Sequence, residues 1–140
     1  MRVSRVPQVL VRVVCACGII AVAGCGDGPK VVPVSGTATL DGKSLGGFMV
    51  TFIPDEANGN VAQVDCSAVL AADGKYSVTT DDRYDQYQGV PPGWYKVTIW
   101  SQDDQKIPVH KKYQGFTTTP LSIEVVADPA PGAYDLKFTK

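Results

Sequence analysis

Apolar and polar residues alternate with a period of two along most of the chain after residue 30, and this alternation constrains the fold more than any other feature. It is clearest at residues 62–70, where Ala62, Val64 and Cys66 begin a series of apolar side chains at every second position. No stretch sustains the repeat of a helix. Because successive side chains of a strand point to opposite faces, each segment has one apolar face that a second layer must cover. The pattern therefore predicts an all-β domain.

Seven segments show this alternation, and turn-forming residues separate them. The dipeptides Asp41-Gly42 and Asp73-Gly74 suit tight hairpin turns. Two sheets that face each other would bury the apolar faces of both, so we expect one antiparallel β-sandwich domain over residues 31–140. The expected strands lie at residues 32–40, 48–52, 62–70, 76–80, 95–99, 121–125 and 134–138. The side chains expected to be largely buried are Phe52, Val64, Leu70, Tyr95, Val97, Leu136 and Phe138.

The start of the chain has the features of an export signal. Arg2, Arg5 and Arg12 give it a positive charge, and residues 13–23 follow without any charge. This apolar run is shorter than the roughly 20 residues that span a bilayer, and small residues precede Cys25, as they precede signal-peptidase cuts. We therefore expect residues 1–24 to be a signal peptide that is removed. A plain secretory signal and an uncleaved anchor are the alternatives.

Residues 22–25, with the sequence VAGC, resemble the lipobox of bacterial lipoproteins, with valine in place of the commoner leucine. The resemblance implies a diacylglyceryl group on the sulfur of Cys25 and often an acyl chain on its new amino group. Two or three chains anchor a protein stably to a membrane. Residues 25–30 would then be a lipidated tether in the cell envelope. Gly26, in place of the aspartate that often retains lipoproteins in the inner membrane, favours the outer membrane.

Charge and cysteine content narrow the class of partner. The signal holds three of the 13 basic residues and none of the 14 acidic ones, so the mature chain has a net charge of about −4 and no basic block. This balance argues against nucleic acid as a partner.

Cys15 and Cys17 leave with the signal, and Cys25 carries lipid. Cys66 remains, and its place on an apolar strand face predicts a buried side chain rather than a reactive thiol.

Several segments, taken in order, resemble a known family. They are Val34-Ser35-Gly36-Thr37, residues 40–47 (LDGKSLGG), Val50-Thr51-Phe52, residues 72–76 (ADGKY), residues 92–97 (PGWYKV), Ile107-Pro108, Lys112-Tyr113 and Thr119-Pro120-Leu121. Their order and spacing resemble short bacterial lipoproteins that carry a carboxypeptidase-regulatory-like domain, which is a seven-stranded transthyretin-like or Ig-like β-sandwich. The resemblance covers nearly all of residues 31–140. It implies a non-catalytic accessory or structural module.

Few residues could support catalysis or hold a metal. His110 is the only histidine, and the sequence supplies neither the carboxylate nor the nucleophile of a catalytic triad around it. One histidine and one cysteine do not make a zinc site, which needs three or four ligands. We therefore expect no catalysis, no metal and no cofactor, with an enzyme-associated module or weak hydrolase using residues 101–119 as the alternative. Calcium binding remains an alternative for the acidic residues of the loops, namely Asp81, Asp82, Asp85, Asp103 and Asp104.

Aromatic residues outside the predicted core are the remaining lead to function. The two longest connections, residues 81–93 and 101–119, are candidates for function because long connections in a small domain are often functional. Exposed aromatic rings commonly bind sugars or protein partners. We therefore predict a non-catalytic structural or binding role, with an envelope protein or a polysaccharide as partner. The alternative is that these loops bury the rings. The candidate binding residues are Tyr84, Tyr87, Trp94, Trp100 and Tyr113.

Overall fold

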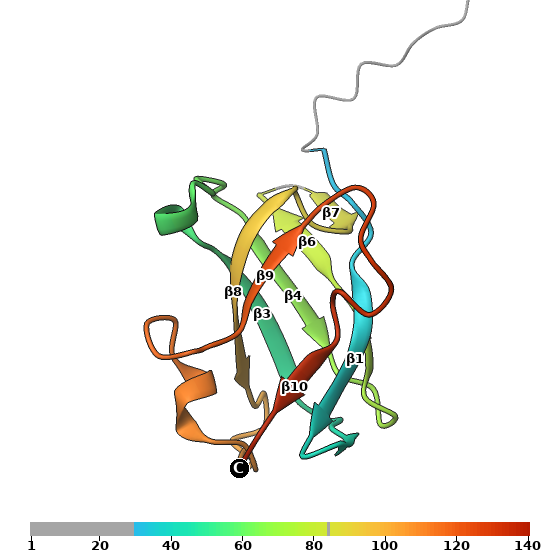
Figure 1. Ribbon diagram of the computed structural model, residues 1–140, viewed down its shortest axis with the longest axis vertical. Coiled ribbons are helices and arrows are strands. Elements are labelled where there is room, and N and C mark those ends of the chain that lie inside the picture. Colours follow the sequence, from blue (N-terminus) through green and yellow to red (C-terminus); the bar gives the residue numbers. More distant parts are fainter. Residues whose placement is uncertain (1–29, 84) are drawn as a thin grey trace, which may run out of the picture.

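Two β-sheets lie against each other in the computed structural model, which describes residues 30–83 and 85–140 (Figure 1). The larger sheet contains, in spatial order, β7 (Asp85–Gln88), β6 (Thr79–Asp82), β4 (Asp65–Val69), β3 (Met49–Pro54), β8 (Gly93–Trp100) and β9 (Ser122–Val125). The smaller sheet contains β10 (Leu136–Phe138), β1 (Ser35–Leu40), β2 (Lys43–Ser44) and β5 (Lys75–Ser77). Two short 3-10 helices, η1 (Glu56–Asn58) and η2 (Lys111–Gln114), lie in connections. The expected signal peptide, Cys25 and Tyr84 lie outside the described residues.

The apolar faces of both sheets form one core, as the alternation predicts. Six of the seven side chains expected to be buried are buried, and Val64 is only partly buried. Val64 precedes β4, where it packs against the core but also lines a surface pocket beside Asp65 and Asp81. The prediction for Val64 therefore holds only in part. The side chains that are almost fully enclosed include Phe52, Leu70, Tyr95, Val97, Leu136 and Phe138.

Polar groups inside the core are hydrogen-bonded. The hydroxyl of Tyr95 donates to the carbonyl oxygen of Pro91 at 2.8 Å, and the hydroxyl of Tyr76 donates to the carbonyl oxygen of Tyr134. Burial raises the pKa of the Tyr95 hydroxyl to about 12, because a phenolate would lose its hydration there. Across the described residues, every buried side-chain nitrogen and oxygen has a partner. The aromatic core residues thus add no unpaired polar group.

The described chain has ten strands where the alternation predicts seven. The expected fourth strand is divided into β5 and β6, because the chain passes from the smaller sheet to the larger one at Val78. Tyr76, Val78 and Thr80 are all buried, so the period of two continues unbroken through this crossing. The other two extra strands, β2 and β7, are polar, and neither has an apolar face that a sequence pattern could reveal.

One pair of strands runs parallel, which corrects the expectation of a purely antiparallel sandwich. β10 pairs with β1 in parallel, with Ala38 opposite Leu136 and Leu40 opposite Phe138. The connection after β9 carries the chain from the edge of the larger sheet across to the smaller one, where β10 joins β1 running in the same direction (Figure 1). The sequence pattern shows which side chains of a strand share a face. It does not show whether the partner strand runs parallel or antiparallel, because that depends on how the chain crosses between the sheets.

The hairpin predicted at Asp41-Gly42 is confirmed, whereas Asp73-Gly74 lies at a turn that joins β4 and β5 of different sheets and is not a hairpin. Leu40 and Lys43 are paired across a two-residue loop, and both loop residues, Asp41 and Gly42, have positive φ angles of 47° and 81°. These angles belong to the hairpin turn whose backbone matches the twist of the flanking strands. The turn joins β1 to β2.

The long connection from residue 101 to residue 119 folds against the end of the sandwich rather than projecting from it. Val109, Tyr113 and Thr119 are buried, and the Thr119 hydroxyl donates to the carbonyl oxygen of Val97 at 2.7 Å. η2 lies within this connection, at the lower end of the domain in Figure 1. None of the helices in residues 30–83 and 85–140 has the length and hydropathy needed to cross a bilayer.

Candidate functional site

Trp94 and Trp100 lie on the face of the larger sheet that points away from the smaller sheet, which we call the outer face. β8 alternates its side chains, so Tyr95, Val97 and Ile99 enter the core while both tryptophans point outward. Trp94 is 36% exposed and Trp100 is 43% exposed. Large apolar side chains that remain accessible on a strand face are candidates for contact with a ligand or partner. The alternating pattern locates both of them correctly.

A hydrogen bond fixes the ring of Trp100 across the neighbouring strand. Its indole N–H donates to the hydroxyl oxygen of Thr51 on β3, with 3.0 Å between Nε1 and Oγ1. Thr51 is paired with Thr98, which lies two residues before Trp100 on β8. The hydrogen bond therefore runs diagonally across the two strands. The indole keeps its polar atom satisfied while much of its apolar surface stays in water. The exposed ring of Trp100 is therefore held in one orientation by this hydrogen bond.

Hydroxyl side chains lie side by side across the middle of the outer face. The strand pairings place Thr51 opposite both Ser67 and Thr98, and Ser67 opposite Thr79. Directly opposite residues of paired strands share a face. Thr98 is buried, and the other three side chains are partly exposed. We call Thr79, Ser67, Thr51 and Thr98 the hydroxyl row.

Further apolar side chains flank the hydroxyl row on the outer face. On one side, the pairings place Met49 opposite both Val69 and Trp100, and Val69 is 57% exposed. On the other side, Ile53 and Phe116 line a pocket of about 380 Å³ together with residues 54–57. Phe116, 41% exposed, was not predicted as a site residue, because it lies in an irregular segment where alternation gives no orientation.

Tyr113 is not part of an exposed surface, which corrects its place among the candidate binding residues. Its side chain is only 3% exposed and lies edge-on to Phe138, with 5.1 Å between ring centroids. Its hydroxyl shares a hydrogen bond of 3.1 Å with the Thr139 hydroxyl. The ring thus attaches the long connection to the core, which was the alternative interpretation of this residue.

The two long connections do not meet, and Tyr87 lies apart from the tryptophans. Asp81, Asp82 and Asp85 lie at the end of the larger sheet where β8 begins, whereas residues 101–119 follow the other end of β8 (Figure 1). Tyr87 is opposite Thr80, whose side chain points to the inner face, so its ring is on the other side of the sheet from Trp94. The structure places Trp94 and Trp100 on the same face, at opposite ends of β8, and Tyr87 on the other face.

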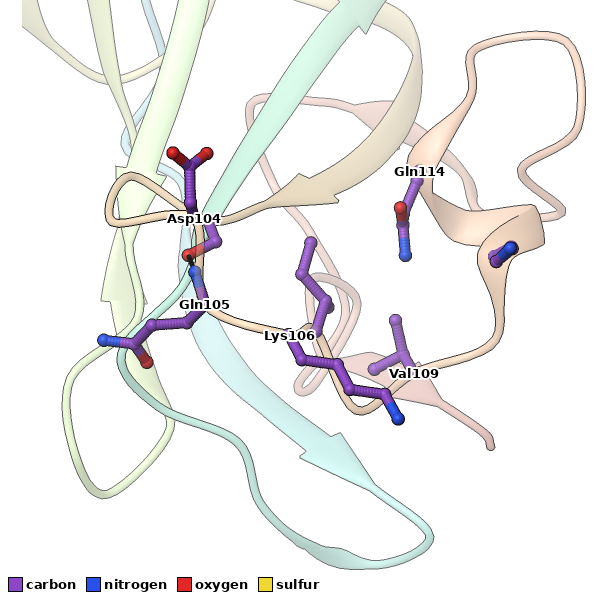
Figure 2. A pocket seen from close by; sticks show the side chains of 8 residues that line it. Asp104, Gln105, Lys106, Val109 and Gln114 are labelled. Atoms are coloured by element: carbon purple, nitrogen blue, oxygen red, sulfur yellow. Dashed lines mark hydrogen bonds between the residues drawn. The ribbon is translucent and has the colours of Figure 1, made fainter.

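The long connection forms a surface pocket with a volume of about 470 Å³. Figure 2 shows Asp104 and Gln105 on one side and Gln114 of η2 on the other, with Lys106 and Val109 between them. Its lining is open and mostly polar. The neighbouring His110 caps η2, since its Nδ1 accepts a hydrogen bond of 3.1 Å from the backbone N–H of Lys112. That bond occupies the nitrogen through which a triad carboxylate would orient the ring.

The acidic loops do not converge. Asp65 is directly opposite Asp81 on neighbouring strands, and Asp81 accepts a hydrogen bond of 2.8 Å from the Gln86 amide. Asp103 and Asp104 lie beyond the far end of the same sheet. In the part of the chain that the structure describes, no group of three or more His, Cys, Asp or Glu side chains is arranged to hold a metal ion. The geometry gives no support to a shared calcium site of the two loops.

Cys66 is fully buried on the inner face of β4, as its position in the pattern predicts. Its sulfur lies 3.2 Å from the hydroxyl oxygen of Thr80. Burial raises the pKa of the Cys66 thiol, because the thiolate would be desolvated. Thiolates, rather than thiols, attack alkylating reagents.

We therefore expect Cys66 to resist maleimide in the folded protein at pH 8 and to react fully after unfolding in guanidinium chloride. Mass spectrometry of the peptide that contains Cys66 measures both states. Rapid labelling of the folded protein would show that β4 opens readily and would contradict the described core.

Comparison with known proteins adds no family to this description. No protein-family model, curated protein or solved structure matches the chain.

Proposed function

We propose that this chain is a bacterial lipoprotein of the cell envelope, anchored through lipid on Cys25, whose folded domain has a non-catalytic binding or structural role. The export features of residues 1–24 and the lipobox-like residues 22–25 support the anchor. The two-sheet, all-β domain supports the finer proposal of a transthyretin-like or Ig-like sandwich of the carboxypeptidase-regulatory-like kind. Gly26 favours the outer membrane as the location. An envelope protein or a polysaccharide would be the partner.

One observation carries the binding role, namely the two exposed tryptophans on the outer face. An antiparallel sheet of a soluble domain commonly presents a polar face to water. Here Trp94, Trp100 and Val69 remain exposed on that face, and a hydrogen bond holds Trp100 in place. An ordered ring loses little conformational entropy when a ligand covers it, so such rings make effective contact points.

The alternative, a weak hydrolase that uses residues 101–119, has less support. The pocket formed there offers lysine, glutamine and aspartate side chains, and Ser101 accepts a hydrogen bond from the backbone N–H of Gln105 at 3.0 Å. His110, the only histidine of the chain, uses its Nδ1 as a helix cap. A general base needs its partner groups within hydrogen-bonding reach of the substrate proton. The geometry therefore favours binding over hydrolysis.

Affinity capture tests the binding role. The full chain, purified in detergent from its own membranes, would be immobilised and exposed to solubilised envelopes of the producing bacterium. We expect saturable retention of an envelope component, and the same chain immobilised after heat denaturation should retain none of it. If nothing is retained in a saturable and fold-dependent way, the binding role is wrong.

A further inference from the structure

We propose that the outer face binds an extended, uncharged polysaccharide chain that lies along β3 and β8. This inference rests on the proposed binding role and names the class of ligand for it. Its first support is the position of the aromatic rings. Trp94 and Trp100 are six residues apart on one strand, and a rise of about 3.3 Å per residue puts about 20 Å between them. A chain of several sugar units can span this length, whereas one small ligand cannot contact both rings.

The groups between the rings match the chemistry of sugars. The hydroxyl row crosses β8 at Thr98, between Trp94 and Trp100 but nearer to Trp100, and Gln88 extends it beyond Thr79. Lys96 lies between the row and Trp94 on β8. Each hydroxyl can donate and accept hydrogen bonds, as can each hydroxyl of a sugar. Aromatic rings at the two ends would cover the apolar C–H faces of sugar rings.

The order of polar and apolar groups argues against a protein partner. Stable protein interfaces have an apolar centre and a polar rim. The outer face has the reverse order, since the hydroxyl row lies in the middle and exposed apolar side chains lie at both ends. Val69 and Trp100 are at one end, and Phe116 and Trp94 are toward the other. A protein laid on this face would bury polar groups at its centre.

The charges of the outer face argue against a polyanion or an anionic membrane surface. Lys96 is the only charged residue among the outward positions of β3 and β8. Three carboxylates flank these strands: Asp65 and Asp81 lie on β4 and β6, and Glu124 on β9 is directly opposite Trp94. Polyanions are bound by clusters of lysine and arginine that displace counterions. A hydroxyl-rich face with one lysine and three carboxylates would repel a polyanion and instead suits a neutral polymer.

Affinity electrophoresis of the full chain in detergent tests the inference. Native gels would contain hydroxyethyl cellulose, galactomannan or laminarin as neutral probes, and polygalacturonate as a charged probe. We expect retardation by at least one neutral polysaccharide. Trp100→Ala should weaken that binding at least about tenfold, as truncation of an aromatic anchor does. Thr51→Val, which removes the acceptor that orients the indole, should weaken it by a smaller factor.

Matched variants separate loss of binding from loss of fold. Tyr87→Ala removes a partly exposed ring from the other side of the sheet and should leave retardation unchanged. Circular dichroism melting would be recorded for every variant. If Trp100→Ala is unfolded, Trp94→Ala and Thr51→Val carry the same test.

Four results would overturn the inference. They are no retardation by any neutral probe, retardation by polygalacturonate alone, equal retardation of the wild type and a Trp94→Ala/Trp100→Ala double variant, and self-association that Trp100→Ala abolishes. Saturable capture of an envelope protein together with no neutral-polysaccharide binding would leave the binding role standing and this inference refuted.

Discussion

Replacing Phe52 or Phe138 with alanine should cost about 3–5 kcal/mol of folding free energy, the usual loss for a buried aromatic side chain. Phe52 is fully buried, with its ring centroid 6.2 Å from that of Tyr76 and 6.3 Å from that of Tyr95. Phe138 lies in the smaller sheet and contacts Tyr113 of the long connection. Because native domains are stable by only about 5–15 kcal/mol, either change can unfold this one.

Denaturant unfolding of the full chain, followed by circular dichroism, measures these losses. Val69→Ala is the control, since Val69 is on the larger sheet but exposed, and surface changes usually alter stability by less than about 0.5 kcal/mol. If both phenylalanine variants unfold at the same denaturant concentration as Val69→Ala, the described core and strand registers are wrong.

Replacing Cys25 with alanine should abolish lipid attachment completely. Alanine has no sulfur to carry the diacylglyceryl group, so the precursor should remain uncut or the chain should be exported without an anchor. Metabolic labelling of cells with a fatty-acid probe, followed by isolation of the protein, measures the attached lipid. The expected change is from full label to none, because the proposed attachment begins at this one atom.

A second cysteine variant controls for general effects on export. Cys17→Ala changes a cysteine within the apolar run and should keep its label, because that residue leaves with the signal. Equal label on the wild type and on Cys25→Ala would refute the assignment of Cys25. Label lost from both variants would point to impaired export instead.

The fold was predictable where burial imposes a period of two. Phe52, Tyr95 and Leu136 were placed in the core correctly, because a half-buried strand repeats its environment at every second residue. β7 was missed because an exposed edge strand of polar residues has no such repeat. The crossing at Val78 was missed for the opposite reason, since its neighbours on both sides stay buried as the chain changes sheets.

The candidate site was predictable only in part, and for the same reason. Trp94 and Trp100 could be placed on the outer face because they are out of phase with buried neighbours in β8. Tyr113 and Phe116 lie in irregular segments, where orientation depends on tertiary contacts, and one proved buried while the other is exposed. The hydroxyl row depends on strand pairing, which joins residues from four strands and which local pattern does not determine.

The tryptophan emission of the protein offers the most direct test of the claim that the outer face is the functional surface. Trp94 and Trp100 are the only two tryptophans of the chain, and both lie on that face, so emission reports on it alone. The full chain in detergent would be titrated with the polysaccharide fraction of native envelopes, freed of protein. The account predicts a saturable change in emission that parallels retention of that fraction by the immobilised protein. Retention with unchanged emission would place the ligand elsewhere on the molecule and contradict the account.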